Sequence, residues 1–204
     1  MNAFGVLFST SSRGEDPAAA TRYGVPDRLP VDAQLVALAK EDRDAAFELL
    51  YNAYRGRIFT FLLRLAGSPE AADDLVQDTF VKAHRALPRL ERDQKLLPWL
   101  YRIANNTAID QLRRRKRLTW LPWAGIHGTP DEPRSSDEQA ASRARADIAE
   151  TLRQLPPDNA AALLLHALEG YSYQEIAAIQ GCSLTAARSR IARARAAFKE
   201  RFPA

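Results

Sequence analysis

Hydrophobic and polar positions follow a helical period along most of this chain. From Val31 to Leu118 and again from about Asp137 to Phe202, apolar residues recur at spacings of three and four, as in amphipathic α-helices. The sequence has no sustained alternation with a period of two and no Asn-Gly turn, which are the signals of strands and hairpins. The pattern therefore predicts an all-α fold made of two small helical bundles.

The segments outside these two blocks have a different composition. Residues 1–30 lack a hydrophobic period and mix Ser, Gly, Pro and charge, so we expect a mobile tail. Residues 119–136 hold three prolines and two glycines, which predicts a flexible linker between domains at 31–118 and 137–204. Trp120 and Trp123 are unusual in a solvated tether and could pack on a folded domain or on a partner.

Capping residues predict where several helices begin. Ser68, Pro69 and Glu70 supply an N-cap hydroxyl, a proline at the first helical position and an early acid, so a helix should run to about Leu87. Another helix should span about Pro98 to Leu118. Ser172 and Glu175 have the spacing of a capping box, and Ser183 can cap the next helix.

The last two helices have the sequence pattern of a helix-turn-helix. A short turn with Gly181 separates them, and the second helix carries an apolar stripe and an opposite polar stripe. The apolar stripe is Leu184, Ala187, Ile191, Ala194 and Phe198, and the polar one is Thr185, Arg188, Ser189, Ala192 and Arg193. Such a helix can pack one face on its domain and offer the other to DNA bases, with Arg190 and Arg195 at the flanks for phosphates. The alternative is a solvated, Arg-rich helix face.

Charge is distributed unevenly along the chain. The formal net charge is +4, yet Arg113 to Arg117 and the segment after Ser183 are each strongly basic, so the remainder is acidic. Two basic stretches favour two contacts with a polyanion such as a nucleic acid. The single Cys182 excludes an internal disulfide, and three scattered histidines give no metal-binding spacing, so we expect no metal and no cofactor. Without a signal peptide or an apolar run of about 18 residues, the protein should have no membrane span and should be cytoplasmic.

The helix that begins near Pro69 carries acids that do not suit DNA. Its first half contains Asp73, Asp74 and Asp78 and no basic residue, and Asp74, Gln77 and Asp78 share one face. Acids early in a helix complement its dipole, which explains part of the pattern. The polar face suits a basic protein partner.

The helix from about Pro98 joins aromatic, amide and basic residues. Trp99 and Tyr101 precede Asn106 and Asp110, an i, i+4 pair, and the helix ends in the basic run. Aromatic residues beside a basic helix could stack on unpaired bases, or they could belong to the core.

Taken together, these motifs resemble a known family. DDLVQDTF, then WLYRIANNTAIDQLRRRKR, a Pro-rich linker and GYSYQEIAAIQGCSLTAARSRIARAR are similar to bacterial RNA polymerase sigma factors of the extracytoplasmic-function (ECF) group. The resemblance covers about residues 31–202.

The resemblance implies a role for each segment. Residues 31–118 would bind core polymerase and the −10 element, and residues 137–204 would read the −35 element. The clamp coiled coil of the largest polymerase subunit would dock on Asp73, Asp74, Gln77 and Asp78. The −10 element would meet Trp99, Asn105, Asn106, Asp110, Arg113 and Arg114, with residues 87–99 capturing a flipped base. The −35 element would meet Thr185, Arg188, Ser189, Arg190 and Arg193.

Such a factor would act through noncovalent binding alone, would need no catalytic residue, and would help to melt the promoter. An anti-sigma factor is a further partner that the family often has. There are three rival hypotheses. A conventional helix-turn-helix regulator would bind its operator without polymerase. A small helical enzyme would need a phosphate loop, a metal cluster or a paired nucleophile, and an adaptor or anti-sigma protein would not need two basic DNA-facing helices.

Overall fold

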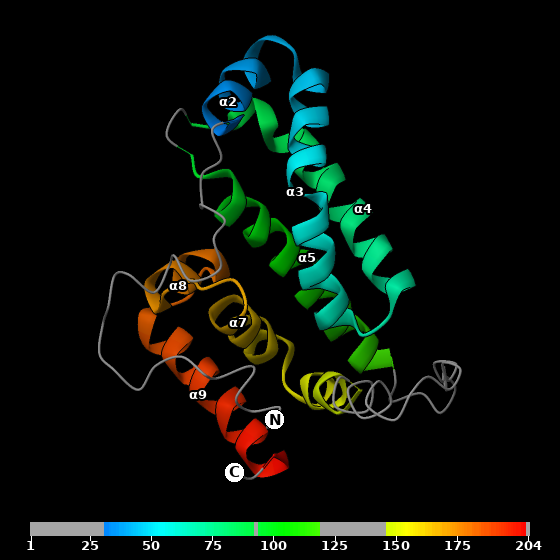
Figure 1. Cartoon of the computed structure of the whole chain (residues 1–204), viewed down its shortest axis with the longest axis vertical. Helices are drawn as coiled ribbons and strands as arrows, with labels where there is room; N and C mark the ends of the chain where they lie inside the picture. The colour runs from blue at the N-terminus through cyan, green and yellow to red at the C-terminus, as the bar shows by residue number, and fades with distance from the viewer. Residues whose placement is uncertain (1–30, 92–93, 119–145, 203–204) are drawn as a thin grey trace, which may run out of the picture.

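The computed structural model describes residues 31–91, 94–118 and 146–202. The predicted tail, the linker with Trp120 and Trp123, and the start of the second helical block lie outside these ranges. Within them, every regular element is a helix, as predicted (Figure 1). The N-terminal domain consists of α2 (Val31–Glu41), α3 (Arg43–Ala66), α4 (Pro69–Ala86), the short 3-10 helix η2 (Leu87–Arg89) and α5 (Leu96–Leu118). The C-terminal domain consists of a helix at 146–154, α7 (Pro157–Ala167), α8 (Tyr173–Gln180) and α9 (Leu184–Arg201).

The predicted caps begin the helices as expected. Ser68 Oγ accepts a hydrogen bond from the backbone N–H of Ala71 at the start of α4. At α8, Ser172 Oγ accepts from the Glu175 N–H, and the Glu175 carboxylate accepts from the Ser172 N–H at 2.9 Å, which completes the capping box. Ser183 caps α9 in the same way as Ser68 caps α4.

The helix that we expected from Pro98 begins two positions earlier, at Leu96. Leu96 and Leu97 bury their side chains completely, and Pro98 lies within the first turn, where its missing N–H leaves no hydrogen bond unmade. Packing of the two leucines thus extends the helix into the segment that the sequence indicated as a loop.

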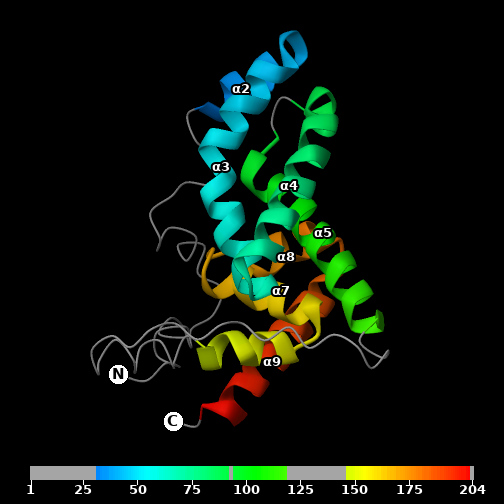
Figure 2. The same ribbon diagram turned by 90° about the vertical axis from the view of Figure 1, so that its right-hand side faces the viewer.

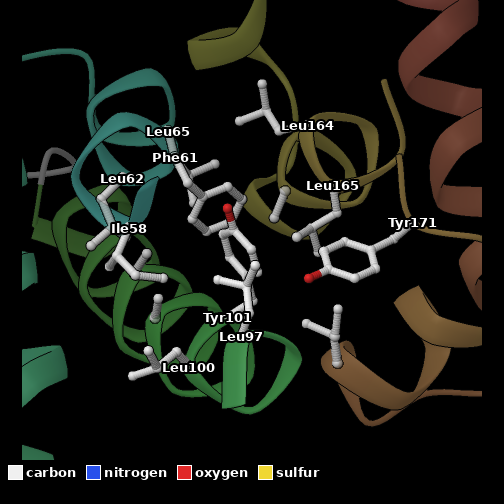
Figure 3. Packing of buried hydrophobic residues seen from close by; sticks show 14 of the residues in the cluster. Ile58, Phe61, Leu62, Leu65, Leu97, Leu100, Tyr101, Leu164, Leu165 and Tyr171 are labelled. Carbon is white, nitrogen blue, oxygen red and sulfur yellow. The ribbon is translucent and has the colours of Figure 1, made fainter. Parts of the chain in front are cut away.

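One continuous hydrophobic core joins the two domains. The long helix α5 packs against α3 and α4 on one side and against α7 and α8 on the other (Figures 1 and 2). The rings of Phe61 and Tyr101 meet edge to face at 5.2 Å, and those of Tyr101 and Tyr171 do so at 5.7 Å (Figure 3). All three are buried. The sequence predicted two domains but not that they would pack on each other.

Candidate functional site

The acidic surface of α4 forms as the sequence predicted. Buried and exposed residues alternate in pairs along this helix, with Ala71, Ala72, Leu75, Val76, Thr79 and Phe80 facing inward. The four residues expected to contact polymerase, Asp73, Asp74, Gln77 and Asp78, are all exposed. Asp73 forms a surface ion pair with Arg55 of α3 at 3.4 Å. Three carboxylates therefore face the solvent on one side of the N-terminal domain.

An open groove beside this acidic surface was not predicted. It has a volume of about 300 Å³ and lies between α3 and α4. Its lining is Phe47, Tyr51, Arg55, Asp73, Val76, Gln77, Phe80 and Val81. Val81 is 43% exposed and follows Asp74, Gln77 and Asp78 along the same helical face. An apolar patch next to the carboxylates gives this surface the mixed character of a protein-binding site. The sequence signal was Phe47 and Tyr51, which recur at a spacing of four on α3.

The residues of α5 that were expected to bind DNA differ in their surroundings. Asn106, Asp110, Arg113 and Arg114 have exposed side chains, and Trp99 is half-buried against the core. Asn105, in contrast, is 1% exposed. Tyr101, which could have been either a stacking platform or a core residue, is a core residue, and burial raises its pKa. The side chains of residues 115–118 lie outside the described part of the structure.

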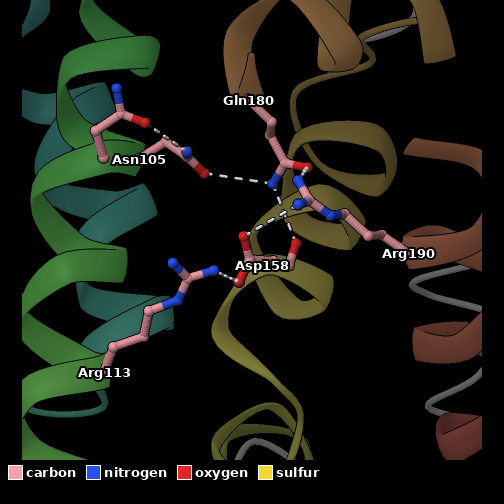
Figure 4. A network of polar contacts seen from close by, with 6 residues as sticks. Asn105, Arg113, Asp158, Gln180 and Arg190 are labelled. Atoms are coloured by element: carbon pink, nitrogen blue, oxygen red, sulfur yellow. Dashed lines mark hydrogen bonds and ion pairs between the residues drawn. The ribbon is translucent and has the colours of Figure 1, made fainter. Parts of the chain in front are cut away.

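A polar network joins α5 to the C-terminal domain (Figure 4). Gln180 Nε2 donates to Asn105 Oδ1 at 3.4 Å and to the backbone carbonyl of Asp158 at 3.1 Å. The Asp158 carboxylate binds Arg113 at 2.7 Å and Arg190 at 3.3 Å through its two oxygens. Gln180 Oε1 also accepts from Arg190 at 2.8 Å. Asp158, at the start of α7, therefore lies between two arginines that were expected to contact nucleic acid.

The helix-turn-helix has the predicted geometry. Gly181 ends α8 in the left-handed conformation, with φ of 61°. On α9 the predicted apolar stripe is buried, except that Leu184 is half-buried. Thr185, Arg188 and Arg193 are exposed on the opposite face, and Ser189 is half-buried. Arg190, expected near a phosphate, is instead 23% exposed and bound to Asp158 and Gln180.

Aromatic contacts hold the exposed Arg188 in place. Its guanidinium lies over the ring of Tyr173, 5.9 Å from the centroid. Tyr173 in turn stacks on His166 at 4.9 Å, and His166 Nδ1 donates to the carbonyl of Tyr171 at 2.9 Å. Burial lowers the pKa of His166, so this imidazole is neutral near pH 7 and Nδ1 carries its proton. The stack presents Arg188 at the N-terminal half of α9.

The described residues contain no cluster of three or more His, Cys, Asp or Glu side chains that could hold a metal ion. In the same part of the chain, no helix is both long and apolar enough to cross a membrane.

Comparison with known proteins agrees with the two-domain organisation. Residues 50–118 match Sigma-70 region 2, and residues 139–198 match Sigma-70, region 4. The RNA polymerase sigma-H factor of Pseudomonas aeruginosa is 35% identical over 175 residues, which are 81% of this chain and 91% of that protein. The ECF RNA polymerase sigma-E factor of Salmonella typhimurium is 34% identical with the same coverage.

Two solved structures are similar in fold as well as sequence. CnrH in complex with the cytosolic domain of CnrY has a TM-score of 0.58 and 32% identity, covering 83% of this chain and 96% of that one. The sigma factor RpoE of Bartonella quintana, solved with the anti-sigma factor NepR, has the same TM-score, 28% identity, and coverage of 79% and 96%.

Proposed function

The chain belongs to the ECF group of RNA polymerase sigma factors, and on this basis we propose that its two domains read the −10 and −35 elements of a promoter. As a sigma factor, it binds core RNA polymerase and directs it to promoters, and it is not an enzyme. The proposal concerns which surfaces do this work. It assigns polymerase and −10 binding to residues 31–118 and −35 binding to residues 137–204, and it places the protein in the cytoplasm, where promoters are.

The acidic face of α4 is the observation that best supports the proposal. Asp73, Asp74, Gln77 and Asp78 are exposed in a protein that otherwise binds a polyanion, and carboxylates repel phosphates. A basic protein surface is the partner that such a face fits. We assign it to the clamp coiled coil of the largest polymerase subunit. The neighbouring groove with Phe47, Tyr51 and Val81 would add apolar contact area to that interface.

The −10 element is assigned to α5. Asn106 and Asp110 offer amide and carboxylate groups to base edges, and Arg113 and Arg114 offer guanidinium groups to phosphates. Asn105, which is buried in this arrangement, would have to be uncovered to contact a base. Trp99 is half-buried and can still present part of its ring to an unstacked base. Trapping unstacked bases would help to melt the promoter, since each unstacking costs a few kcal/mol that the pocket must offset.

The −35 element is assigned to α9. Thr185, Arg188 and Arg193 are exposed on the face opposite Ala187, Ile191 and Phe198, and Ser189 lies beside them. An arginine at the N-terminal half of a recognition helix can pair with guanine O6 and N7 in the major groove. Arg190, which we also place at this interface, would have to exchange Asp158 for a phosphate.

An anti-sigma factor is a proposed further partner. The similar structures of CnrH and RpoE were solved with CnrY and with the anti-sigma factor NepR.

The assignment of the α4 face can be tested by reversing its charge. Asp74→Arg combined with Asp78→Arg should abolish co-purification with core polymerase and run-off transcription from a promoter library, because the new arginines would repel a basic partner. The helix should remain folded, since both side chains are exposed.

The matched control is Glu41→Arg with Glu48→Arg, which makes the same charge change at exposed positions of α2 and α3. It should leave both activities nearly intact. Normal polymerase binding by the Asp74 and Asp78 variant would contradict the assignment. If the protein binds DNA tightly without polymerase, and adding polymerase does not change that affinity, a conventional regulator would be favoured.

A further inference from the structure

The contact between the domains occupies the same groups that we assign to promoter DNA. Asn105 is 1% exposed and accepts its hydrogen bond from Gln180, so a base edge cannot reach it. Arg113 binds the Asp158 carboxylate at 2.7 Å, and Arg190 binds the other oxygen at 3.3 Å. A carboxylate between two arginines takes the place that a phosphate group would have on DNA (Figure 4).

The contact between the domains also has an apolar core. Tyr101 and Tyr171 pack edge to face within a core that continues from α3 to α7 (Figure 3). Arg57 of α3 binds Glu169 at 2.9 Å, and these side chains are only 26% and 11% exposed. Apolar contact together with a partly desolvated ion pair distinguishes this interface from a surface encounter of two solvated domains.

The polymerase-facing surface is affected differently. In the same arrangement the four proposed polymerase contacts on α4 remain exposed, while Asn105 on α5 is covered. Core polymerase could therefore dock on the closed protein, whereas full contact of α5 with DNA requires the C-terminal domain to leave. Asn106, Asp110 and Arg114 stay exposed in the closed form, so the block is partial.

We propose that Asp158 and Gln180 form an intramolecular latch, with the Asp158 carboxylate acting as a phosphate mimic that competes with DNA for α5. The latch holds the free protein closed and weakens its binding to DNA until polymerase separates the domains. The inference rests on the proposed function, because it takes Asn105 and Arg113 as DNA contacts. In a closed–open equilibrium, the apparent affinity for DNA falls in proportion to the open fraction.

The first test measures the domain contact without DNA. Donor and acceptor dyes are placed at Thr60→Cys on α3 and Gln174→Cys on α8, both exposed and close in sequence to the ion-paired Arg57 and Glu169, in a Cys182→Ala background. Energy transfer should be high in the free protein and should fall when core polymerase is added. Asp158→Asn should lower it, while Asp147→Asn, the same change at an exposed carboxylate of the same domain, should not.

A charge swap gives an independent route to the open form. Arg57→Glu alone should lower energy transfer because Glu169 would then face a like charge. Adding Glu169→Arg should restore it by re-forming the pair with reversed signs. Neither residue belongs to the proposed DNA or polymerase contacts.

The second test measures DNA binding without polymerase, by fluorescence anisotropy of a mixed-sequence single-stranded oligonucleotide. Asp158→Asn should tighten binding by on the order of tenfold relative to Asp147→Asn, which corrects for the shared loss of one negative charge. Arg57→Glu should also tighten DNA binding, although this substitution adds negative charge. Arg57→Glu combined with Glu169→Arg should return the affinity for the oligonucleotide to its original value.

Low energy transfer in the unaltered protein would overturn the inference, as would transfer unchanged by both Asp158→Asn and Arg57→Glu. So would an opened protein that binds the oligonucleotide no better. In each of these cases run-off transcription would still support the proposed function. If the unaltered protein with core polymerase supported no transcription from any promoter, that result would instead contradict the proposed function.

Discussion

Arginines on one helix of this protein have different surroundings, and the roles that we propose for them differ accordingly. On α9, Arg188 and Arg193 are exposed, whereas Arg190 is held by Gln180 and Asp158. The helical period predicted the first two, because they lie opposite Ala187 and Ile191. It could not predict the pairing of Arg190, since Asp158 comes from α7 and reaches it only through tertiary packing.

The role of Arg188 can be tested on promoters. On the proposed assignment, Arg188→Ala should weaken promoter binding by about 1–3 kcal/mol through the loss of one base contact, and transcription should fall chiefly where the −35 element is intact. Run-off transcription from paired templates with intact and scrambled −35 elements measures this difference. Lys199→Ala, at an exposed position in the last turn of α9, should lower transcription from both templates equally or from neither. Equal losses for Arg188→Ala on both templates would mean that Arg188 contacts phosphate only.

At two glycines the backbone conformation should decide whether substitution by alanine stabilises or destabilises the fold. Gly56 lies in the middle of α3, and Gly181 ends α8 with φ of 61°. A Cβ atom at either position would meet nothing within 4 Å, so packing does not distinguish them. Only the backbone conformation does.

The same substitution should therefore have opposite effects at the two positions. Gly56→Ala should raise the free energy of unfolding by about 0.5–1 kcal/mol, because alanine favours a helix interior. Gly181→Ala should lower it by about 1–2 kcal/mol, because a side chain is strained in the left-handed region, and Gly181→Asn should lower it less. Urea denaturation measures all three. A stabilising effect of Gly181→Ala would contradict the assigned turn.

Local rules predicted the elements of this fold well, because caps and periodicity act over a few residues. Ser68, Ser172 and Gly181 occupy the positions that the sequence indicated. The candidate site was predicted less completely. Exposure of Asp74 and Asp78 follows from the period of α4, and the period of α5 places Asn105, four positions after the buried Tyr101, on the inner face of its helix. The partner of Asn105 could not be predicted in this way, because Gln180 comes from α8 and reaches it only through tertiary packing.

For the whole molecule, Tyr101 connects the stability of the two domains. It is completely buried between Phe61 of α3 and Tyr171, which precedes α8. The unaltered protein should consequently unfold in one transition, seen alike by tryptophan fluorescence, which includes Trp99, and by far-ultraviolet circular dichroism.

Removing that ring should uncouple the domains. Tyr101→Ala should cost about 3–5 kcal/mol and should separate the two denaturation curves, because it removes contacts on both sides at once. Phe80→Ala, at a buried ring of α4 that packs on Phe47 and Tyr51, should cost a similar amount while the curves still coincide. Coincident curves for Tyr101→Ala would show that the ring does not link the domains.

The order of synthesis gives the latch a consequence in time. Arg57 precedes its partner Glu169 by 112 positions, and Asn105 precedes Gln180 by 75. Helices α2 to α5 emerge from the ribosome and can pack locally before α7 and α8 exist, at about 5–20 residues per second. For some seconds the nascent chain presents α5 uncovered. A newly made molecule is thus at its most open before its last helices are translated, and it closes itself as it is completed.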